Sequence, residues 1–259
     1  MSTSAPSYDD ETLQVHLAQS ARAFPGPDYY IVLHWVHQYL RPERYLEIGV
    51  RSGESLRAAL PETKCLGIDP EPQVGATTDS RLQICRMTSD DFFAHHSLQE
   101  VWQSPTFDLA FIDGLHLFEQ TLQDFMNLER TATRKSLILL HDCIPLDAVT
   151  CARDRTTHFY SGDVWKAVHC LRRMRPDLKL TIVRTAPTGL CLVGNLNPAS
   201  EVMSSAYEEI KRKYLPLMFG DYLALRHEMP AMIDNTPEAV RSCLEALAQD
   251  VASAGAPVP

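Results

Sequence analysis

Residues 46–55 read Leu46-Glu47-Ile48-Gly49-Val50-Arg51-Ser52-Gly53-Glu54-Ser55. This stretch is a short apolar run, then a turn with two glycines, then the start of a helix. The glycines let the backbone approach a ligand closely, and the first turn of a helix offers free N–H groups. The spacing of Gly49 and Gly53 differs from the GxGxxG pattern of a dinucleotide site, and Glu47 favours a cationic ligand. A nicotinamide dehydrogenase is therefore disfavoured.

Similar apolar runs recur along the chain and alternate with longer amphipathic segments. The runs cover residues 45–49, 65–69, 82–87, 107–113, 136–142, 178–183 and 190–193. The helix-like segments between them cover residues 54–60, 90–102, 117–131 and 164–174. This alternation favours a mostly parallel sheet with helices on both faces. We therefore predict an α/β, Rossmann-like fold with a seven-stranded sheet.

Acidic residues end four of these runs, namely Glu47, Asp69, Asp113 and Asp142. In an open α/β sheet the ligand binds beyond the carboxyl ends of the strands, so these side chains should converge on one crevice. Asp69 follows the second run and is placed to accept hydrogen bonds from two ribose hydroxyls. An acidic residue in such a place can also serve only as a helix cap, and Ser89-Asp90 before Phe92 can be only an N-cap.

The segments on either side of the alternating region read as helical. Residues 1–43 are predicted to form an N-terminal helical cap with a break at Phe24-Pro25-Gly26-Pro27, and residues 198–259 a C-terminal helical extension. Residues 44–197 then form the ligand-binding core. The helices outside the sheet could supply the contact face of a homo-oligomer.

Composition limits the possible partners. The 259 residues carry a formal charge of −9, which argues against binding nucleic acid through its phosphates. No apolar stretch is long enough for a membrane span, and the polar N-terminus has no signal core. Seven cysteines without a CxxC pair indicate reduced, buried thiols. We expect a cytoplasmic protein whose partner is a small molecule.

The sequence resembles the class I S-adenosylmethionine-dependent methyltransferases, and more narrowly the group that contains macrolide-sugar and rhamnosyl O-methyltransferases and cephalosporin hydroxylase-like proteins. The likeness runs from about Tyr45 to Asn197. It is carried by Glu47-Ile48-Gly49-x-x-x-Gly53, Phe111-Ile112-Asp113-Gly114-x-His116 and Leu140-His141-Asp142. A later motif, residues 161–166 (Ser161-Gly162-Asp163-Val164-Trp165-Lys166), is also similar but has no role assigned to it.

The resemblance implies an antiparallel last strand and a set of cofactor-binding residues. Glu47, Gly49, Ser52, Gly53 and Ser55 would surround the methionine end of S-adenosylmethionine. Asp69 would hold the ribose, Thr88, Ser89 and Asp90 would flank the adenine, and Asp113 would also border the cofactor.

Methyl transfer requires an aligned acceptor whose oxygen loses a proton. Asp113 and His116 follow the fourth run, and His141-Asp142 ends the fifth, so the four side chains can meet, and their carboxylates could hold a hard ion such as Mg²⁺. The resemblance implies that Asp113 and Asp142 bind the metal and that His116 is the catalytic base. His141 replaces a carboxylate of the family pattern. Three alternatives stay open: weak Mg²⁺ binding, a transition ion in its place, or no metal.

The sequence therefore predicts an S-adenosylmethionine-dependent O-methyltransferase that acts on a hydroxyl of a sugar or a secondary metabolite, with metal assistance. Asp113, His116 and Asp142 are its predicted catalytic residues, and Asp113, His141 and Asp142 its predicted metal ligands. Two alternatives remain: a protein of this fold with non-methylating chemistry, and a cofactor-binding subunit without catalysis. His141 is the only residue that supports the last alternative.

Overall fold

The computed structural model describes residues 10–75 and 79–254. Helices α1 (Asp10–Ala23) and α2 (Tyr29–Leu40) come first and are separated by the predicted break at residues 24–27. Asp28 caps α2, because its side chain accepts a hydrogen bond from the Ile31 N–H. Within the described ranges, no helix is both long and apolar enough to cross a membrane.

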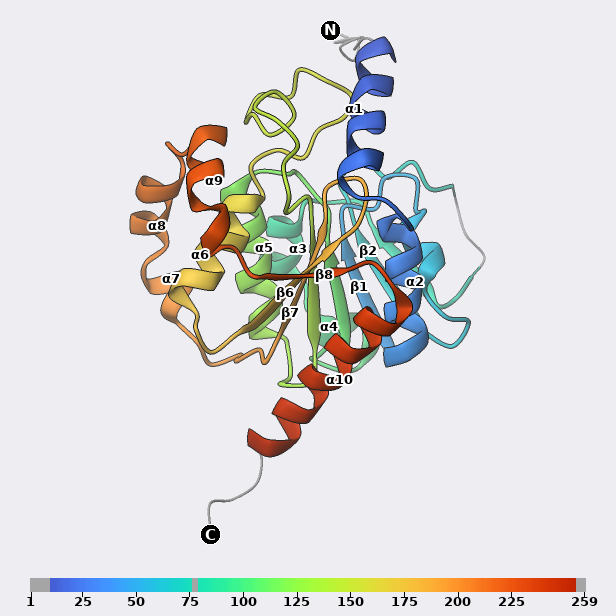
Figure 1. Ribbon diagram of the computed structural model, residues 1–259. Coiled ribbons are helices and arrows are strands. Elements are labelled where there is room, and N and C mark those ends of the chain that lie inside the picture. Colours follow the sequence, from blue (N-terminus) through green and yellow to red (C-terminus); the bar gives the residue numbers. More distant parts are fainter. Residues whose placement is uncertain (1–9, 76–78, 255–259) are drawn as a thin grey trace, which may run out of the picture.

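One sheet forms the centre of the described molecule, with strand order β3-β2-β1-β4-β5-β7-β6-β8 (Figure 1). The strands are β1 (Arg44–Ile48), β2 (Lys64–Ile68), β3 (Leu82–Cys85), β4 (Leu109–Ile112), β5 (Leu137–His141), β6 (Lys179–Arg184), β7 (Leu190–Gly194) and β8 (Ala231–Asp234). Strands β1 to β5 pair in parallel, whereas β7 is antiparallel to both β5 and β6. The predicted Rossmann-like sheet is confirmed, including its antiparallel last core strand.

The eighth strand corrects the predicted seven-stranded sheet, and it lies inside the segment predicted as a C-terminal helical extension. Strand β8 lies within residues 198–259 and pairs in parallel with β6 at the edge of the sheet. It is only four residues long, and three of its side chains are exposed. A short, exposed edge strand has little hydrophobic periodicity, so its sequence does not predict it.

Helices cover both faces of the sheet. The remaining helices are η1 (Ser55–Ala58), α3 (Ser89–His95), α4 (Leu98–Trp102), α5 (Phe118–Arg130), α6 (Trp165–Met174), α7 (Val202–Ser205), α8 (Tyr207–Tyr214), α9 (Phe219–Leu225), η2 (Arg226–Glu228) and α10 (Pro237–Ala254). The helix predicted over residues 90–102 is two helices, because Ser97 starts α4 with its own capping box.

Alternate residues of each strand pack into two separate cores. Leu46 and Ile48 of β1 face the core that contains Phe118 and Phe125 of α5. Tyr45 faces the opposite core, which contains Val36 of α2 and other side chains from α2 and α10. Because both faces are buried, the strand ends are where polar groups become accessible.

An early and a late segment of the chain are hydrogen-bonded to each other beside the sheet. The Asn235 side chain, just after β8, donates hydrogen bonds to the carbonyls of Pro25 and Pro27 in the turn between α1 and α2. Ser20 of α1 donates to the carbonyl of Pro187 in the turn between β6 and β7. These bonds hold α1 beyond the sheet, beside the loop that follows β5 (Figure 1).

All seven cysteines lie among the described residues, and all are free thiols. Five are buried and two are partly buried. This agrees with the expectation of reduced, buried thiols.

Candidate functional site

The glycine turn after β1 brings two strand ends into contact. Gly49 has a φ of +89°, and a Cβ atom at this position would lie 2.1 Å from the carbonyl oxygen of Asp113. Asp113 in turn donates its N–H to the carbonyl of Ile48, at 2.8 Å. Glycine is therefore required at position 49, both by its backbone conformation and by the approach of the chain after β4.

Asp69 borders the same turn from the end of β2. Its Oδ2 accepts hydrogen bonds from the N–H groups of Val50 (2.9 Å) and Arg51 (2.8 Å), and its Oδ1 accepts one from Glu71 (2.7 Å). The carboxylate thus fixes the loop that holds Arg51 and Ser52. Asp69 also lines the cavity described below, and its Oδ1, which accepts only one of these hydrogen bonds, can accept a further one.

The start of α3 supplies another part of the site. Thr88 caps this helix by accepting the N–H of Asp91, and Ser89 donates to Asp124 of α5 at 2.6 Å. Asp90 accepts a hydrogen bond from the Gln120 side chain at 3.2 Å. The segment therefore fits both predictions, a helix cap and a part of the ligand site. It caps α3, and its three residues, Thr88, Ser89 and Asp90, also line the cavity.

Two of the predicted cofactor residues do not line the cavity. Glu47 is fully buried behind the glycine turn, where Tyr45 and Ser55 donate to its carboxylate at 2.7 and 2.6 Å. Burial raises the pKa of Glu47 to about 8, despite these two hydrogen bonds. Gly53 has a φ of +73° and shapes the turn from outside the wall. The other predicted cofactor residues, Gly49, Ser52, Ser55, Asp69, Thr88, Ser89, Asp90 and Asp113, do line the cavity.

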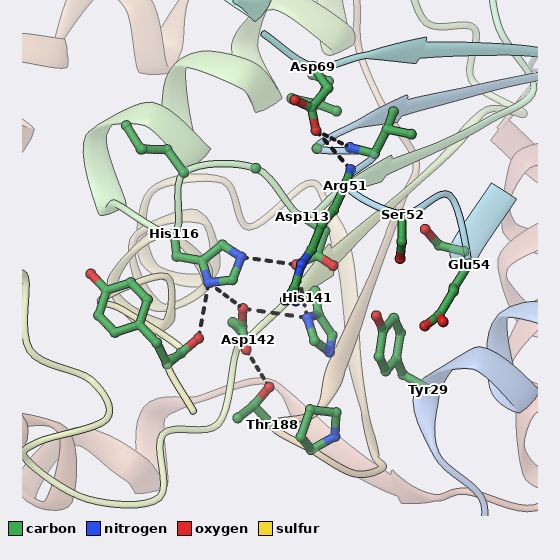
Figure 2. Close-up of a pocket in the computed structure, with 18 of the residues that line it drawn as sticks. Tyr29, Arg51, Ser52, Glu54, Asp69, Asp113, His116, His141, Asp142 and Thr188 are labelled. Carbon is green, nitrogen blue, oxygen red and sulfur yellow. Dashed lines mark hydrogen bonds and ion pairs between the residues drawn. The ribbon is translucent and has the colours of Figure 1, made fainter. Parts of the chain in front are cut away.

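Asp113, His116, His141 and Asp142 form one cluster (Figure 2). His141 Nδ1 lies 3.0 Å from Asp113 Oδ1 and 3.5 Å from Asp142 Oδ2. On the other side, His116 Nε2 lies 3.2 Å from Asp113 Oδ1 and His116 Nδ1 lies 2.9 Å from Asp142 Oδ2. Two imidazoles therefore alternate with two carboxylates, as expected from neighbouring strands β4 and β5.

The charges of this cluster support one another. Burial opposes the charged forms, but the carboxylates of Asp142 and Asp113 outweigh it and raise the pKa of His141 to about 10. The same two carboxylates raise the pKa of His116 well above its usual value. The imidazoles in turn lower the pKa values of Asp113 and Asp142 in spite of burial.

Two members of the cluster have unusual backbone conformations. His116 has a φ of +60° and Asp142 a φ of +59°, a region that non-glycine residues seldom adopt. Asp142 is fixed by Thr188, whose hydroxyl donates to Asp142 Oδ1. Such conformations cost free energy and concentrate at functional sites, so the fold holds these two side chains in place against that cost.

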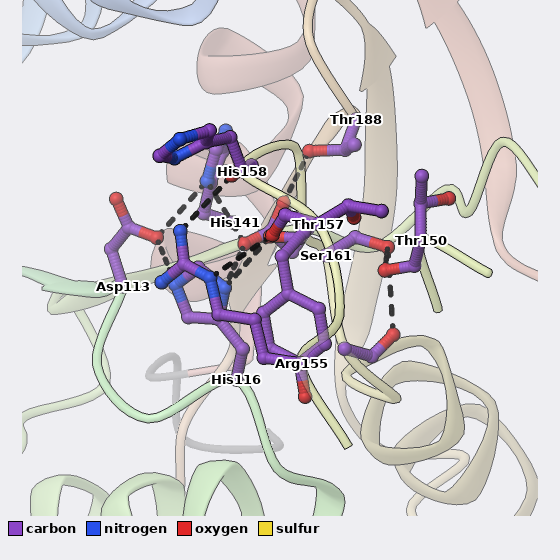
Figure 3. A network of polar contacts seen from close by, with 12 residues as sticks. Asp113, His116, His141, Thr150, Arg155, Thr157, His158, Ser161 and Thr188 are labelled. Atoms are coloured by element: carbon purple, nitrogen blue, oxygen red, sulfur yellow. Dashed lines mark hydrogen bonds and ion pairs between the residues drawn. The ribbon is translucent and has the colours of Figure 1, made fainter. Parts of the chain in front are cut away.

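His116 is held by the segment that carries Thr150, Thr157, His158 and Ser161 (Figure 3). The ring of Tyr160 stacks on its imidazole with centroids 5.9 Å apart. His116 Nδ1 lies 3.1 Å from the carbonyl oxygen of Tyr160. Because a carbonyl only accepts, this contact places the proton on Nδ1 and leaves Nε2 as the nitrogen that can take up a proton.

The motif of residues 161–166 explains how this segment is anchored. The Asp163 N–H donates to the His116 carbonyl at 3.1 Å, and Asp163 Oδ1 accepts the N–H of Phe118, the first residue of α5. Asp163 Oδ2 accepts from Arg153 and Lys166, each at 2.8 Å. The Asp163 side chain is 1% exposed. The motif therefore clamps both the backbone of His116 and the start of α5.

The cluster opens into a cavity of about 1220 Å³. One part of its wall comes from the glycine turn, Asp69 and the start of α3. Another comes from Leu13, Leu17 and Ala21 of α1 together with Phe159 and Tyr160 of the long loop. Helix α1 is fixed there by a contact between His16 Nε2 and Asp147 Oδ2 at 3.3 Å. The volume exceeds that of most single-ligand pockets, so two small molecules can be accommodated.

Sequence reasoning missed several residues of the wall. Tyr29 packs its ring 4.0 Å, between centroids, from the ring of His141. Asp124 is buried, which raises its pKa to about 6 although Ser89 and Gln120 donate to it. Glu54 lines the cavity beside Ser52. A carboxylate on the buried face of α5 is a signal that could have identified Asp124, whereas nothing in the local sequence marks Tyr29.

Comparisons with known proteins agree with this architecture. Residues 46–143 match the family model described as a methyltransferase domain. The cofactor-bound structure of Rv0187 from MTB is 20% identical with a TM-score of 0.52, and the match covers 72% of this chain and 90% of that one. The O-methyltransferase TomG from Streptomyces achromogenes, solved with SAM, is 20% identical with a TM-score of 0.50 over 73% and 91% of the two chains. Among curated proteins, no sequence matches this chain. The structural similarity to these two proteins establishes a shared fold.

Proposed function

The chain carries a methyltransferase domain of the class I fold, and on this premise we propose that it transfers a methyl group from S-adenosylmethionine to a hydroxyl of a small molecule. The observation that supports this proposal best is that the acid–imidazole cluster and the glycine turn line the same large cavity. A cofactor at the turn and an acceptor at the cluster would then meet in the same space.

The cofactor would bind along the glycine turn. Asp69 is the acceptor of hydrogen bonds from the ribose, and Ser89, Asp90 and Asp124 lie where the adenine would be recognised. Ser52 and Ser55 offer hydroxyls near the methionine end. Glu47 acts indirectly in this arrangement, because it fixes the turn from behind through Tyr45 and Ser55.

The residues at the cluster fit a divalent metal ion. Ligand atoms of Asp113, His141 and Asp142 all lie within 4.8 Å of one another. Asp142 Oδ2 is buried, and its contacts with the two imidazoles lack hydrogen-bond geometry, so it keeps a lone pair without a donor. A bound metal would lower the pKa of an acceptor hydroxyl. The carboxylates orient the two imidazoles, and the buried wall limits access of water.

His116 is the proposed general base. Its Nδ1–H is held by the Tyr160 carbonyl, so Nε2 is the atom that would receive the proton of the acceptor hydroxyl. The His116 side chain is 22% exposed, and it lines the cavity. A metal ion held by Asp113 and Asp142 would offset the two carboxylates that favour the protonated ring, and so would leave His116 neutral and able to accept this proton.

The acceptor would lie between the cluster and α1. Leu13, Leu17 and Ala21 give this side an apolar surface, and Phe159 and Tyr160 add aromatic rings. These side chains favour an acceptor that carries an apolar ring or chain next to its reactive hydroxyl, such as a sugar derivative or another secondary metabolite. The seven free thiols support a reducing, cytoplasmic location.

Calorimetric titration with S-adenosylhomocysteine tests the cofactor site. We expect saturable binding to the wild type and a loss of about 1–3 kcal/mol, roughly 10- to 100-fold in affinity, in Asp69→Ala. Asp234→Ala is the matched control, because this exposed aspartate also ends a strand and lies outside the cavity. Absence of binding to the wild type would refute the proposal.

Methyl transfer is tested by incubating the protein with S-adenosylmethionine and a panel of hydroxylated small molecules, with S-adenosylhomocysteine release measured by mass spectrometry. Release with an acceptor in wild type, reduced about 100-fold or more in His116→Ala, supports the proposal. Binding without release across acceptors of every class would instead support a cofactor-binding subunit or other chemistry on this fold.

A further inference from the structure

We infer that the cluster of Asp113, His141 and Asp142 is a site for a divalent transition-metal ion, with His141 as a nitrogen ligand, and that it discriminates against Mg²⁺. The inference rests on the proposed function, because it specifies the metal of the same site. Three observations carry it: the donor set, the environment of the His141 ring, and the charge of the cluster.

The donor set contains only two carboxylates among its three ligand residues. Mg²⁺ favours six oxygens in a regular octahedron and is reluctant to lose water. Imidazole nitrogen instead suits ions such as Fe²⁺, Ni²⁺ and Zn²⁺, and histidine together with a carboxylate is typical of Fe²⁺ sites. His141 is therefore the residue that separates the two classes of metal.

The His141 ring is held in a fixed place by its neighbours. It packs against Tyr29 at 4.0 Å and against Phe111 at 6.1 Å, measured between ring centroids. Its Nδ1 faces Asp113 Oδ1 at 3.0 Å, and its side chain is only 6% exposed. The ring thus presents one nitrogen to the carboxylates and has little room to turn away, as a preorganised ligand should.

The charges of the cluster also match one divalent ion. Two carboxylates balance the charge of a divalent cation, and a neutral imidazole adds a donor without adding charge. A third carboxylate would instead add an oxygen ligand, which is the donor type that Mg²⁺ prefers. Asp142 Oδ2 is the buried oxygen without a hydrogen-bond donor, so a ligand position already exists on the side shared with His141.

The test uses the full chain after removal of metals. Calorimetry with Mg²⁺, Mn²⁺ and Co²⁺ gives the affinities, and pulsed electron paramagnetic resonance of the Mn²⁺ complex detects coupling to a directly bound nitrogen. We expect Co²⁺ to bind about tenfold or more tightly than Mg²⁺ and more tightly than Mn²⁺, because affinity for a site with a nitrogen ligand rises from Mn²⁺ to Co²⁺. We also expect a nitrogen coupling in the Mn²⁺ spectrum.

His141→Asp is the decisive variant and His34→Asp its control, since His34 is exposed on α2 away from the cavity. His141→Asp should lose the nitrogen coupling and reduce the difference in affinity between Co²⁺ and Mg²⁺, whereas His34→Asp should leave the coupling and this difference unchanged. A second variant, His141→Asn, offers an oxygen without added charge and should also lose the coupling.

Each of the following results would overturn the inference. These are Mg²⁺ binding as tight as that of Co²⁺, a Mn²⁺ spectrum without nitrogen coupling, and a coupling that persists in both His141 variants, which would assign the nitrogen to His116. S-adenosylhomocysteine is titrated into the same samples. Cofactor binding without metal binding would overturn this inference and leave the methyltransferase proposal intact, whereas loss of both would overturn the two together.

Discussion

Gly162 lies against the carbonyl oxygen of His116, so closely that a Cβ atom at position 162 would be 1.9 Å from that oxygen. The two residues are 46 positions apart in the chain, and both have a positive φ. The contact joins the long loop after β5 to the residue proposed as the general base. It makes the position of His116 depend on a glycine that never enters the cavity.

Gly162→Ala is therefore expected to displace His116 and to lower methyl transfer by about tenfold or more while S-adenosylhomocysteine binding is kept, because a 1 Å shift of a catalytic group is costly. The measurement is kcat with a responsive acceptor beside calorimetry of the cofactor. Gly220→Ala is the control, since a Cβ atom at position 220 has nothing within 4 Å. An unchanged kcat in Gly162→Ala would show that the contact between Gly162 and the His116 carbonyl does not determine the position of the His116 side chain.

Glu47→Gln is expected to increase the stability of the protein at high pH. The folded pKa of Glu47, about 8, is raised above the usual value of 4.5. The ionised carboxylate therefore weakens the folded state as the pH rises from about 4.5 through 8. Glutamine keeps the shape and one oxygen acceptor, so cofactor affinity should change little.

Urea unfolding at pH 5 and pH 9 measures this effect. The free energy of unfolding of the wild type should fall relative to that of Glu47→Gln between these two values. Equal pH dependence in the two proteins would mean that the pKa of Glu47 is not raised in the folded protein. A loss of cofactor affinity in Glu47→Gln would indicate that Glu47 contacts the ligand directly.

The metal-free cluster should also make stability depend on pH. The folded pKa of His141, about 10, is above its usual value of 6.5, so its contribution is complete below 6.5 and is lost as the pH rises through 10. We expect the metal-free wild type to lose stability between pH 7 and pH 10 more steeply than His141→Gln. Thermal unfolding in the presence of a chelator measures the difference, and parallel curves would contradict the assignment.

Thr188→Val is expected to weaken metal binding without removing a ligand. The Thr188 hydroxyl is buried and donates to Asp142 Oδ1, and loss of such an outer partner usually costs 10- to 100-fold in metal affinity. Thr185→Val is the matched control, because that hydroxyl donates to the carbonyl of Pro27 instead. Titration with Mn²⁺ compares the two. Equal affinities would show that Thr188 does not hold Asp142 for the metal.

The sequence predicted the cluster because Asp113 and Asp142 follow strands that pair with each other. Parallel strands end at the same edge, so strand order alone brings these side chains together. Glu47 is different, since it precedes the turn and its side chain points into the core that contains Tyr45. Strand alternation distinguishes the two faces, but it does not show whether a polar residue near the strand end reaches the ligand or is enclosed.

The residues that were missed depend on packing between distant segments. Tyr29 meets His141 only because α2 lies on one face of the sheet, and no local pattern in the sequence specifies that contact. Strand β8 needs β6 as a partner, and its own four residues carry no clear periodicity. The helical cap was predicted from its hydrophobic pattern, but its contribution of Leu13 and Leu17 to the cavity wall was not.

The hydrogen bonds from Asn235 to Pro25 and Pro27 connect the end of β8 to the turn between α1 and α2, from which α1 extends along the cavity. The part of the cavity wall formed by α1 is therefore supported by a contact between two segments about 200 residues apart in the chain. Substitution of Asn235 is therefore expected to shift the α1 part of the wall, although Asn235 itself does not line the cavity. Directed evolution of the substrate range should therefore include the residues around Asn235 as well as those that line the cavity.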